Sequence, residues 1–195
     1  KELAASIYEK IEWPWFVDKS NNQFYMSYDP VAQKFKDGHW DFYGEQLMMY
    51  FLGAGSKTHP IGVDVYNAFR RIKGKYGEYE FINSWFGSIF TYQFSHAFID
   101  FRNIVDEDGF DWYANSVNAS KAHIAFAESQ SDKYLTYSDS AWGFTACDGP
   151  NGYSGLYGSA PSGYSNDAHR VDGTVPPAGA LGSLPFAPEI VIPTA

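Results

Sequence analysis

The spacing of hydrophobic and polar positions along the chain predicts a mainly α-helical protein with few short strands. Apolar residues recur at helical spacing in six segments, which are residues 2–12, 46–52, 60–73, 89–101, 111–130 and a short final stretch from Pro188. Residues 24–28 and 79–82 are better explained as strands. From Thr145 to Ser183 helical spacing disappears and Gly, Pro, Ser, Asp and Tyr dominate, which predicts long, ordered, ligand-facing loops.

The expected helices are of two kinds. Residues 46–52 and 89–101 are apolar on nearly all sides, whereas 60–73 and 111–130 carry a single apolar stripe. A helix that is apolar all round is buried, and one with a single stripe forms an outer wall. The alternation therefore predicts an inner and an outer layer of helices.

Several residues have the chemistry of helix ends. Asp41 is expected to cap the helix over 46–52, because a short carboxylate can accept a hydrogen bond from a free backbone N–H in the first turn. Gly53 and Gly55 are expected to end that helix. Pro60 suits the first position of the next one, where its missing N–H costs nothing.

Glu45 is the most informative single residue. It falls at helical spacing with Met48, Met49 and Leu52, which predicts one shared face. A carboxyl group kept out of water has a raised pKa, as a general acid that works near neutral pH requires. The same residue could instead complement the helix dipole from the first turn. The residues alone leave both interpretations open.

A polar stripe runs along the otherwise apolar segment 89–101. Gln93, His96 and Asp100 follow the spacing i, i+3 and i+7, so they must either line a polar cavity or satisfy one another by hydrogen bonds. Arg102 is an expected partner of Asp100 or Asp106. His96 and Asp100 could share a metal ion, but a third ligand at diagnostic spacing is missing, so a hydrogen-bonding network is predicted and no metal.

The amino-acid composition and net charge exclude several classes of function. The 195 residues suffice for one domain or a large piece of one. A net charge of −9 argues against a nucleic-acid partner, which requires clustered Lys and Arg. No apolar run is long enough to cross a membrane. The single Cys147 excludes a disulfide within the chain.

Aromatic residues are unusually frequent, at 19% of the chain. Tyrosines in loops can stack on a flat ligand face and donate a hydrogen bond, which weakly favours a carbohydrate ligand. In the loop region Asp148 and Asp172 each precede a glycine, a dipeptide typical of turns. A turn is favoured for Asp172, while a turn and a chemical role are equally open for Asp148. No motif of serine hydrolases or phosphate-binding loops is present.

Several short motifs occur in order along nearly the whole chain. They are Trp13-Pro14-Trp15, Trp40-Asp41-x-Tyr43-x-Glu45, Gly55-Ser56-x-Thr58-His59-Pro60-Ile61, Gln93-x-Ser95-His96-x-x-Ile99-Asp100-Phe101-Arg102, Asn115-Ser116, Trp142-Gly143-x-Thr145-Ala146-Cys147-Asp148-Gly149-Pro150, Asp172-Gly173-Thr174-Val175-x-Pro177 and Gly182-Ser183-Leu184-Pro185-Phe186-Ala187-Pro188-Glu189. Together they resemble the bacterial glycoamylase-like family that includes endo-β-1,2-glucanases.

The resemblance implies an (α/α)6 toroid, in which six inner and six outer helices surround a substrate cleft. Long Gly/Pro/Tyr-rich loops and few short strands would complete the fold. Since five or six helices are visible here, the resemblance implies that residues 1–195 form the central portion of the catalytic domain, without its N- and C-terminal parts.

The resemblance also implies a glycoside hydrolase that cleaves a β-linked glucan, with β-1,2-glucan favoured and Glu45 as the general acid. The catalytic base would lie in the missing downstream part, so the enzyme is expected in the intact parent and left open for the isolated chain. The substrate-binding residues it implies are Trp40, Asp41, Tyr43, Gln93, His96, Asp100, Arg102, Trp142, Asp148 and Asp172. A transglycosylase and a non-catalytic glucan-binding fragment are the alternatives.

An oligo- or polysaccharide is the expected partner, with no cofactor, no nucleic acid and no membrane insertion. The resemblance to the glycoamylase-like family also implies export to the periplasm or the exterior of the cell. The oligomeric state is left open.

Overall fold

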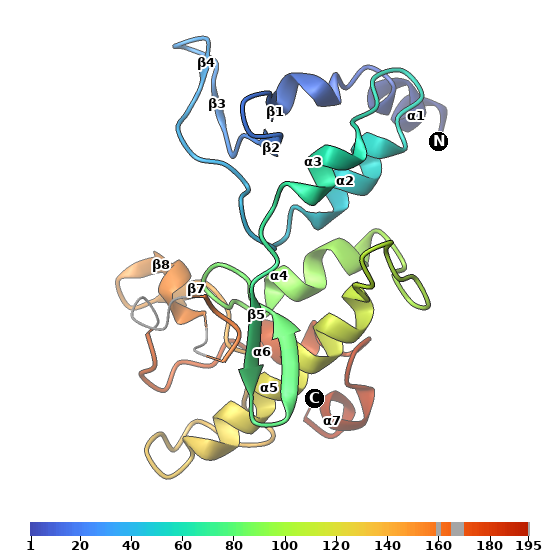
Figure 1. The fold of residues 1–195 in the computed structure, drawn as a ribbon. Coiled ribbons are helices and arrows are strands. Elements are labelled where there is room, and N and C mark those ends of the chain that lie inside the picture. Colours follow the sequence, from blue (N-terminus) through green and yellow to red (C-terminus); the bar gives the residue numbers. More distant parts are fainter. Residues whose placement is uncertain (159–160, 165–169, 195) are drawn as a thin grey trace. The chain divides into compact units, whose positions relative to one another are not determined.

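The computed structural model describes residues 1–158, 161–164 and 170–194. The chain divides into two compact units, Lys1–Arg71 and Ile72–Ala195, and each is described by itself. Helices are the main regular structure of the described residues, and the strands are short (Figure 1). This agrees with the helical class predicted from the sequence.

Unit 1 contains three helices, one 3-10 helix and two small antiparallel hairpins. In chain order the elements are α1 (Glu2–Tyr8), η1 (Trp13–Phe16), β1 (Val17–Asp18), β2 (Gln23–Phe24), β3 (Tyr28–Asp29), β4 (Lys34–Phe35), α2 (Leu47–Ala54) and α3 (Val63–Asn67). β1 pairs with β2, and β3 pairs with β4.

Unit 2 is built around one long helix. In chain order its elements are β5 (Lys73–Tyr76), β6 (Tyr79–Ile82), α4 (Phe90–Gln93), η2 (Phe94–Ala97), α5 (Trp112–Ser129), β7 (Cys147–Gly149), β8 (Gly152–Ser154), η3 (Gly155–Tyr157), α6 (Pro177–Leu181) and α7 (Pro188–Thr194). β5 pairs with β6 and β7 with β8, in both cases antiparallel.

Several elements lie where the sequence predicts them. β6 has the predicted bounds, and α7 begins at Pro188. α5 fills the predicted segment 111–130 and is capped by Asp111, whose Oδ1 accepts a 2.8 Å hydrogen bond from the backbone N–H of Ala114. A carboxylate in this position satisfies one of the N–H groups that a helix leaves free at its start.

α2 exists as predicted, but it buries a different face. It begins at Leu47, so Glu45 precedes it, and its buried residues are Leu47, Tyr50 and Gly53. Leu52, expected on the buried face, is 36% exposed. A side chain at Gly53 would come within 2.9 Å of Ile61 Cδ1. The close approach of Ile61 over Gly53 therefore turns this face inward.

The ends of α2 and α3 differ in part from the prediction. Gly55 ends α2 as expected, whereas Gly53 lies inside the helix. Pro60 does not begin α3, because the backbone N–H of Ile61 bonds the carbonyl of Gly53 at 3.2 Å and keeps this stretch extended. α3 begins only at Val63.

The predicted helix over 89–101 is divided into α4 and η2. The carbonyl of Tyr92 would accept the N–H of His96 in a continuous α-helix, but it accepts the hydroxyl of Ser116 at 2.7 Å instead. The chain tightens into a 3-10 turn at this point, and Asp100 lies beyond the last helical residue. Gln93, His96 and Asp100 therefore do not share one helical face.

α5 was expected to be an outer wall, and this is wrong. It carries buried residues along its whole length, namely Trp112, Asn115, Ser116, Ala119, Ser120, Ala122, His123, Ile124, Phe126 and Ala127. Small side chains in its middle allow β6 and α4 to pack closely on it. Its C-terminal half joins the hydrophobic core cluster of unit 2, with Trp142, Phe144 and Val191.

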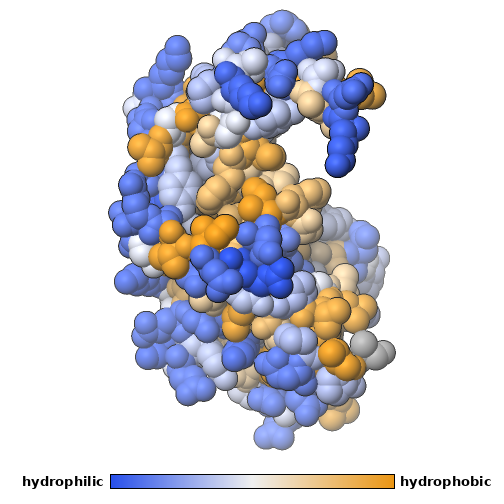
Figure 2. Space-filling model, turned by 90° about the vertical axis from the view of Figure 1, so that its right-hand side faces the viewer, coloured by the Kyte–Doolittle hydropathy of each residue, from blue (hydrophilic) through white to orange (hydrophobic). Residues whose placement is uncertain are grey.

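Within the region from Thr145 to Ser183, the described residues form β7, β8, η3 and α6, and residues 159–160 and 165–169 lie outside the described structure. Phe144 before it is buried as expected, but Leu181 and Leu184 are about half exposed, at 51% and 45%. On the face drawn in Figure 2, hydrophobic areas lie between hydrophilic ones.

Candidate active site

Glu45 lies in the turn that leads into α2. The backbone N–H of Leu47 bonds the carbonyl of Gly44 at 3.2 Å, which closes this turn around Glu45. The side chain is half-buried, and burial raises the pKa of Glu45 above its ordinary 4.5. A carboxyl group that keeps its proton at higher pH can deliver it to a substrate oxygen.

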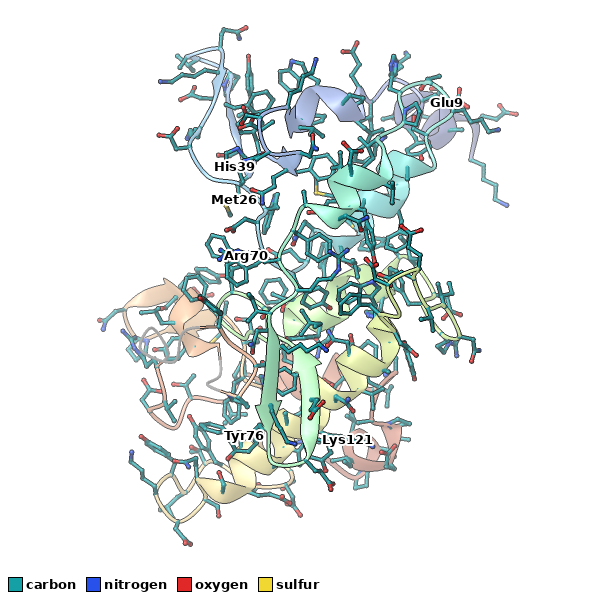
Figure 3. All side chains as sticks on the ribbon, in the orientation of Figure 1. Glu9, Met26, His39, Arg70, Tyr76 and Lys121 are labelled. Carbon is teal, nitrogen blue, oxygen red and sulfur yellow. The ribbon has the colours of Figure 1, made fainter. Side chains whose placement is uncertain are left out.

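An ion pair fixes the chain four residues before Glu45. Asp41 accepts a hydrogen bond from Arg70 at 2.5 Å, and the backbone N–H of Arg70 bonds the carbonyl of Asp41 at 2.8 Å. The guanidinium also lies 3.9 Å from the ring centroid of Phe42. Arg70 follows α3 and is labelled in Figure 3. Asp41 is therefore an anchor for this stretch and does not cap α2, as the sequence had predicted.

Gln46 is a functional candidate that sequence reasoning missed. It is buried, and its amide donates a 2.5 Å hydrogen bond to the carbonyl of Phe42. This bond ties the two sides of the turn that holds Glu45. The sequence feature that could have indicated this role is a glutamine directly before an apolar helix. Of the other residues predicted here, Tyr43 is buried and Trp40 is half-buried.

In unit 2 the structure brings together three of the predicted site residues. His96, Asp100 and Arg102 line one cavity of about 260 Å³ with Tyr113, Pro185 and Phe186. Arg102 bonds Asp100 through two nitrogens, at 2.8 and 2.7 Å, and this pairing lowers the pKa of Asp100 to about 2. The carboxylate therefore stays ionised. The sequence left open whether Arg102 pairs with Asp100 or with Asp106, and in the structure it pairs with Asp100.

His96 is neutral over most of the pH range. Burial lowers its pKa from 6.5 to about 4, and this outweighs the opposite effects of Asp100 and Asp111. Its Nε2 lies 3.0 Å from the hydroxyl of Ser116, which itself bonds the carbonyl of Tyr92. The hydroxyl proton is used in that bond, so Nε2 is assigned as the donor to Ser116.

The burial of His96 predicts a loss of stability in acid. The unfolded chain binds a proton near pH 6.5 and the folded one only near 4, so the free energy of unfolding falls as the pH drops between these values. His96→Gln should reduce this loss, which amounts to up to about 3 kcal/mol. Urea unfolding at pH 7 and pH 4 measures it. An equal acid loss in the variant would contradict the assignment.

Gln93 lies outside this cavity and links two elements. Its amide donates to the carbonyl of Gly179 and to the hydroxyl of Ser183, both at 2.8 Å. A side chain at Gly182 would overlap the amide oxygen of Gln93. In the described structure Gln93 thus ties α4 to α6.

The last three predicted residues have different surroundings. Trp142 is fully buried in the core cluster, so no face of its indole is open to stack on a sugar, contrary to the expected role. Asp148 is exposed on β7, opposite Tyr153 of β8. Asp172 is exposed and accepts the N–H of Thr174 at 3.1 Å, which is the turn predicted for it.

Among residues 1–158, 161–164 and 170–194, no three His, Cys, Asp or Glu side chains come together in a way that could hold a metal ion. Within the same ranges, no helix has both the length and the apolar character needed to span a membrane.

Comparison with known proteins identifies the family. A family model described as "Glycoamylase: Putative glucoamylase" matches residues 37–195. The chain belongs to the glycoamylase family. A search of curated proteins gave no match.

Solved structures similar to this glycoamylase-family chain share its fold. An endo-β-1,2-glucanase from Chitinophaga pinensis has a TM-score of 0.80 and 22% identity, over 95% of this chain and 45% of that one. A β-1,2-glucanase from Parabacteroides distasonis has a TM-score of 0.83 and 17% identity, over 99% and 30%. A "putative glucoamylase" from Bacteroides uniformis has a TM-score of 0.83 and 24% identity, over 99% of this chain and 46% of that one. The chain thus spans less than half the length of these structures.

Proposed function

We propose that the protein containing this chain is a glycoside hydrolase that cleaves a β-linked glucan, with β-1,2-glucan as its substrate. Family membership and the two β-1,2-glucanases of similar fold support the substrate class. The observation that carries the mechanism is the half-buried Glu45, whose pKa burial raises. Within the family fold, residues 1–195 would form the central portion of an (α/α)6 toroid.

In the proposed reaction Glu45 protonates the glycosidic oxygen as its bond to the anomeric carbon breaks. A second carboxylate, from the rest of the domain, removes a proton from the attacking water. The separation of the two carboxyl groups would distinguish this inverting scheme from a retaining one, in which the second carboxylate first attacks the anomeric carbon and water then releases the sugar. No cofactor takes part in this scheme.

Each unit, taken by itself, offers groups suited to a sugar substrate. The bonds of Asp41 to Arg70 and of Gln46 to Phe42 hold the turn of Glu45 in place. In unit 2 the fixed carboxylate of Asp100 can accept hydrogen bonds from sugar hydroxyls at the cavity it shares with His96. Asp148, being exposed, is available for a sugar contact. A periplasmic or extracellular location would give access to a polymeric substrate.

Product analysis tests the reaction class. With β-1,2-glucan, hydrolysis should release one new reducing end for each bond broken and yield short oligosaccharides. A transglycosylase would redistribute chain lengths or close rings without a net gain of reducing ends. Binding of the glucan without any change in chain length, by the intact parent as well as by this chain, would leave only a binding function. Either of these two results would overturn hydrolysis.

A further inference from the structure

Unit 1 contains a cavity of about 580 Å³, distinct from the His96 cavity of unit 2, and no residue of the Glu45 turn lines it. Trp15, Tyr25 and Phe35 line it together with Glu12, Asp18 and His59. All of these except His59 precede residue 37, where the match to the family model begins. Its volume is in the range of small-ligand sites, which measure roughly 300–1,000 Å³.

Three aromatic residues, Trp15, Tyr25 and Phe35, are among those that line this cavity. The indole of Trp15 lies 4.5 Å from the ring of Phe35 and 4.8 Å from that of Tyr28, between ring centroids. Tyr25 stacks on Phe35 at 4.2 Å and 10°. Tyr28 and Phe35 are cross-strand partners of β3 and β4, so the hairpin fixes the cluster.

Trp15 remains 45% exposed in spite of these neighbours. A large ring that is held by other rings and still open to water loses little conformational freedom when a ligand covers it. It is therefore preorganised to stack on a flat apolar face.

A fixed carboxylate lies at the same cavity. Asp18 accepts hydrogen bonds from the hydroxyl and the backbone N–H of Ser20, at 2.7 and 2.9 Å, and from Nε2 of His39 at 2.9 Å. The bonds from Ser20, chiefly, lower the pKa of Asp18 to about 2, so it stays ionised. His39 is labelled in Figure 3. Both bonds from Ser20 end on Oδ1 and the bond from His39 ends on Oδ2, so a ligand hydroxyl at Asp18 would bond Oδ2.

The cavity is lined by two carboxylates, Glu12 and Asp18, and by one ammonium group, Lys19, so its net charge is −1. Such a rim disfavours an anion and offers acceptors and a donor to a ligand with many hydroxyl groups. A pyranose has an apolar face for an indole and hydroxyls at its edge for carboxylates, an imidazole and an ammonium group.

We propose that this cavity is a second carbohydrate site that binds a β-glucan chain through Trp15 and the carboxylates of Glu12 and Asp18. The choice of a β-glucan rests on the proposed function. The site would hold the polymer while another part of it is cleaved. It would therefore affect long substrates more than short ones.

Titration calorimetry with β-1,2-linked gluco-oligosaccharides tests this, on a Glu45→Gln background that prevents turnover. Trp15→Ala should raise the Kd by about tenfold or more, as loss of a central tryptophan does at binding surfaces. The Kd of Trp15→Phe should lie between those of Trp15→Ala and the unchanged background. Glu12→Gln, at an exposed position where folding is not at risk, should also weaken binding. The control Val31→Ala, 93% exposed and outside the cavity, should change nothing.

In the active protein, Trp15→Ala should raise KM for long glucan and leave cleavage of short oligosaccharides unchanged. If glucan is cleaved but neither its binding nor this KM depends on Trp15 or Glu12, the second site is refuted and the proposed function stands. If no β-glucan is bound or cleaved, both fail. If Trp15→Ala abolishes only self-association in sedimentation experiments, the cavity is an interface between copies and the sugar site is refuted.

Discussion

Replacing Glu45 with Gln is expected to lower the kcat for glucan cleavage by about 100- to 10,000-fold, the range that general acid catalysis contributes. The amide has nearly the shape of the carboxyl group but cannot give its proton to the glycosidic oxygen. Folding should be preserved, because the variant removes a carboxyl whose ionisation burial already disfavours. Reducing-end assays on the intact protein, with circular dichroism as the check on folding, measure both effects.

The pH dependence adds a second readout. A general acid is active while protonated, so wild-type activity should decline as the pH rises through the raised pKa of Glu45. That decline should be absent from the residual activity of Glu45→Gln. Glu9→Gln, an exposed carboxyl on the same unit just after α1, is the matched control and should behave as wild type. Unchanged turnover in Glu45→Gln would remove this residue from the mechanism.

Replacing Gly143 with Ala should destabilise unit 2 by at least about 3 kcal/mol, well above the usual effect of a point mutation. Gly143 has a φ of +91°, which side chains rarely adopt. A Cβ there would overlap the backbone nitrogen of Ala180 and lie 2.5 Å from the carbonyl carbon of Gly179. Backbone atoms cannot rotate away, so α6 would have to shift. Urea unfolding followed by tryptophan fluorescence measures the loss.

Gly152→Ala separates the two causes of this effect. Gly152 has nearly the same φ, +93°, but nothing lies within 4 Å of its added Cβ. The free energy of unfolding of this variant should therefore fall only by the cost of placing a side chain at a positive φ, about 1–2 kcal/mol. Equal losses at the two positions would show that the approach of α6 to Gly143 does not constrain the fold.

Of the two interpretations that the residues left open for Glu45, burial with a raised pKa agrees with the structure, but its structural origin differs. That interpretation was based on a helical face shared with Met48, Met49 and Leu52, yet Glu45 precedes α2 and Leu52 is exposed. The turn of Glu45 is closed by the backbone bond of Leu47 to Gly44 and by the side chain of Gln46, which bonds Phe42. These contacts join residues three and four apart, but no periodic pattern of hydrophobic residues indicates them.

The sequence by itself determined the family, through ordered motifs, and the elements whose signals are local. β6, α5 and the turn at Asp172 are of this kind, because side-chain periodicity and Asp-Gly chemistry act between neighbours in the chain.

Only the tertiary structure decided which faces are buried. Ile61 packs over Gly53 and turns α2, and Ser116 takes the carbonyl of Tyr92 and divides the predicted helix after α4. The burial of Trp142 depends in the same way on packing against α5 and α6. These contacts join residues that are distant in sequence, and a pattern read along one segment contains no information about its partner.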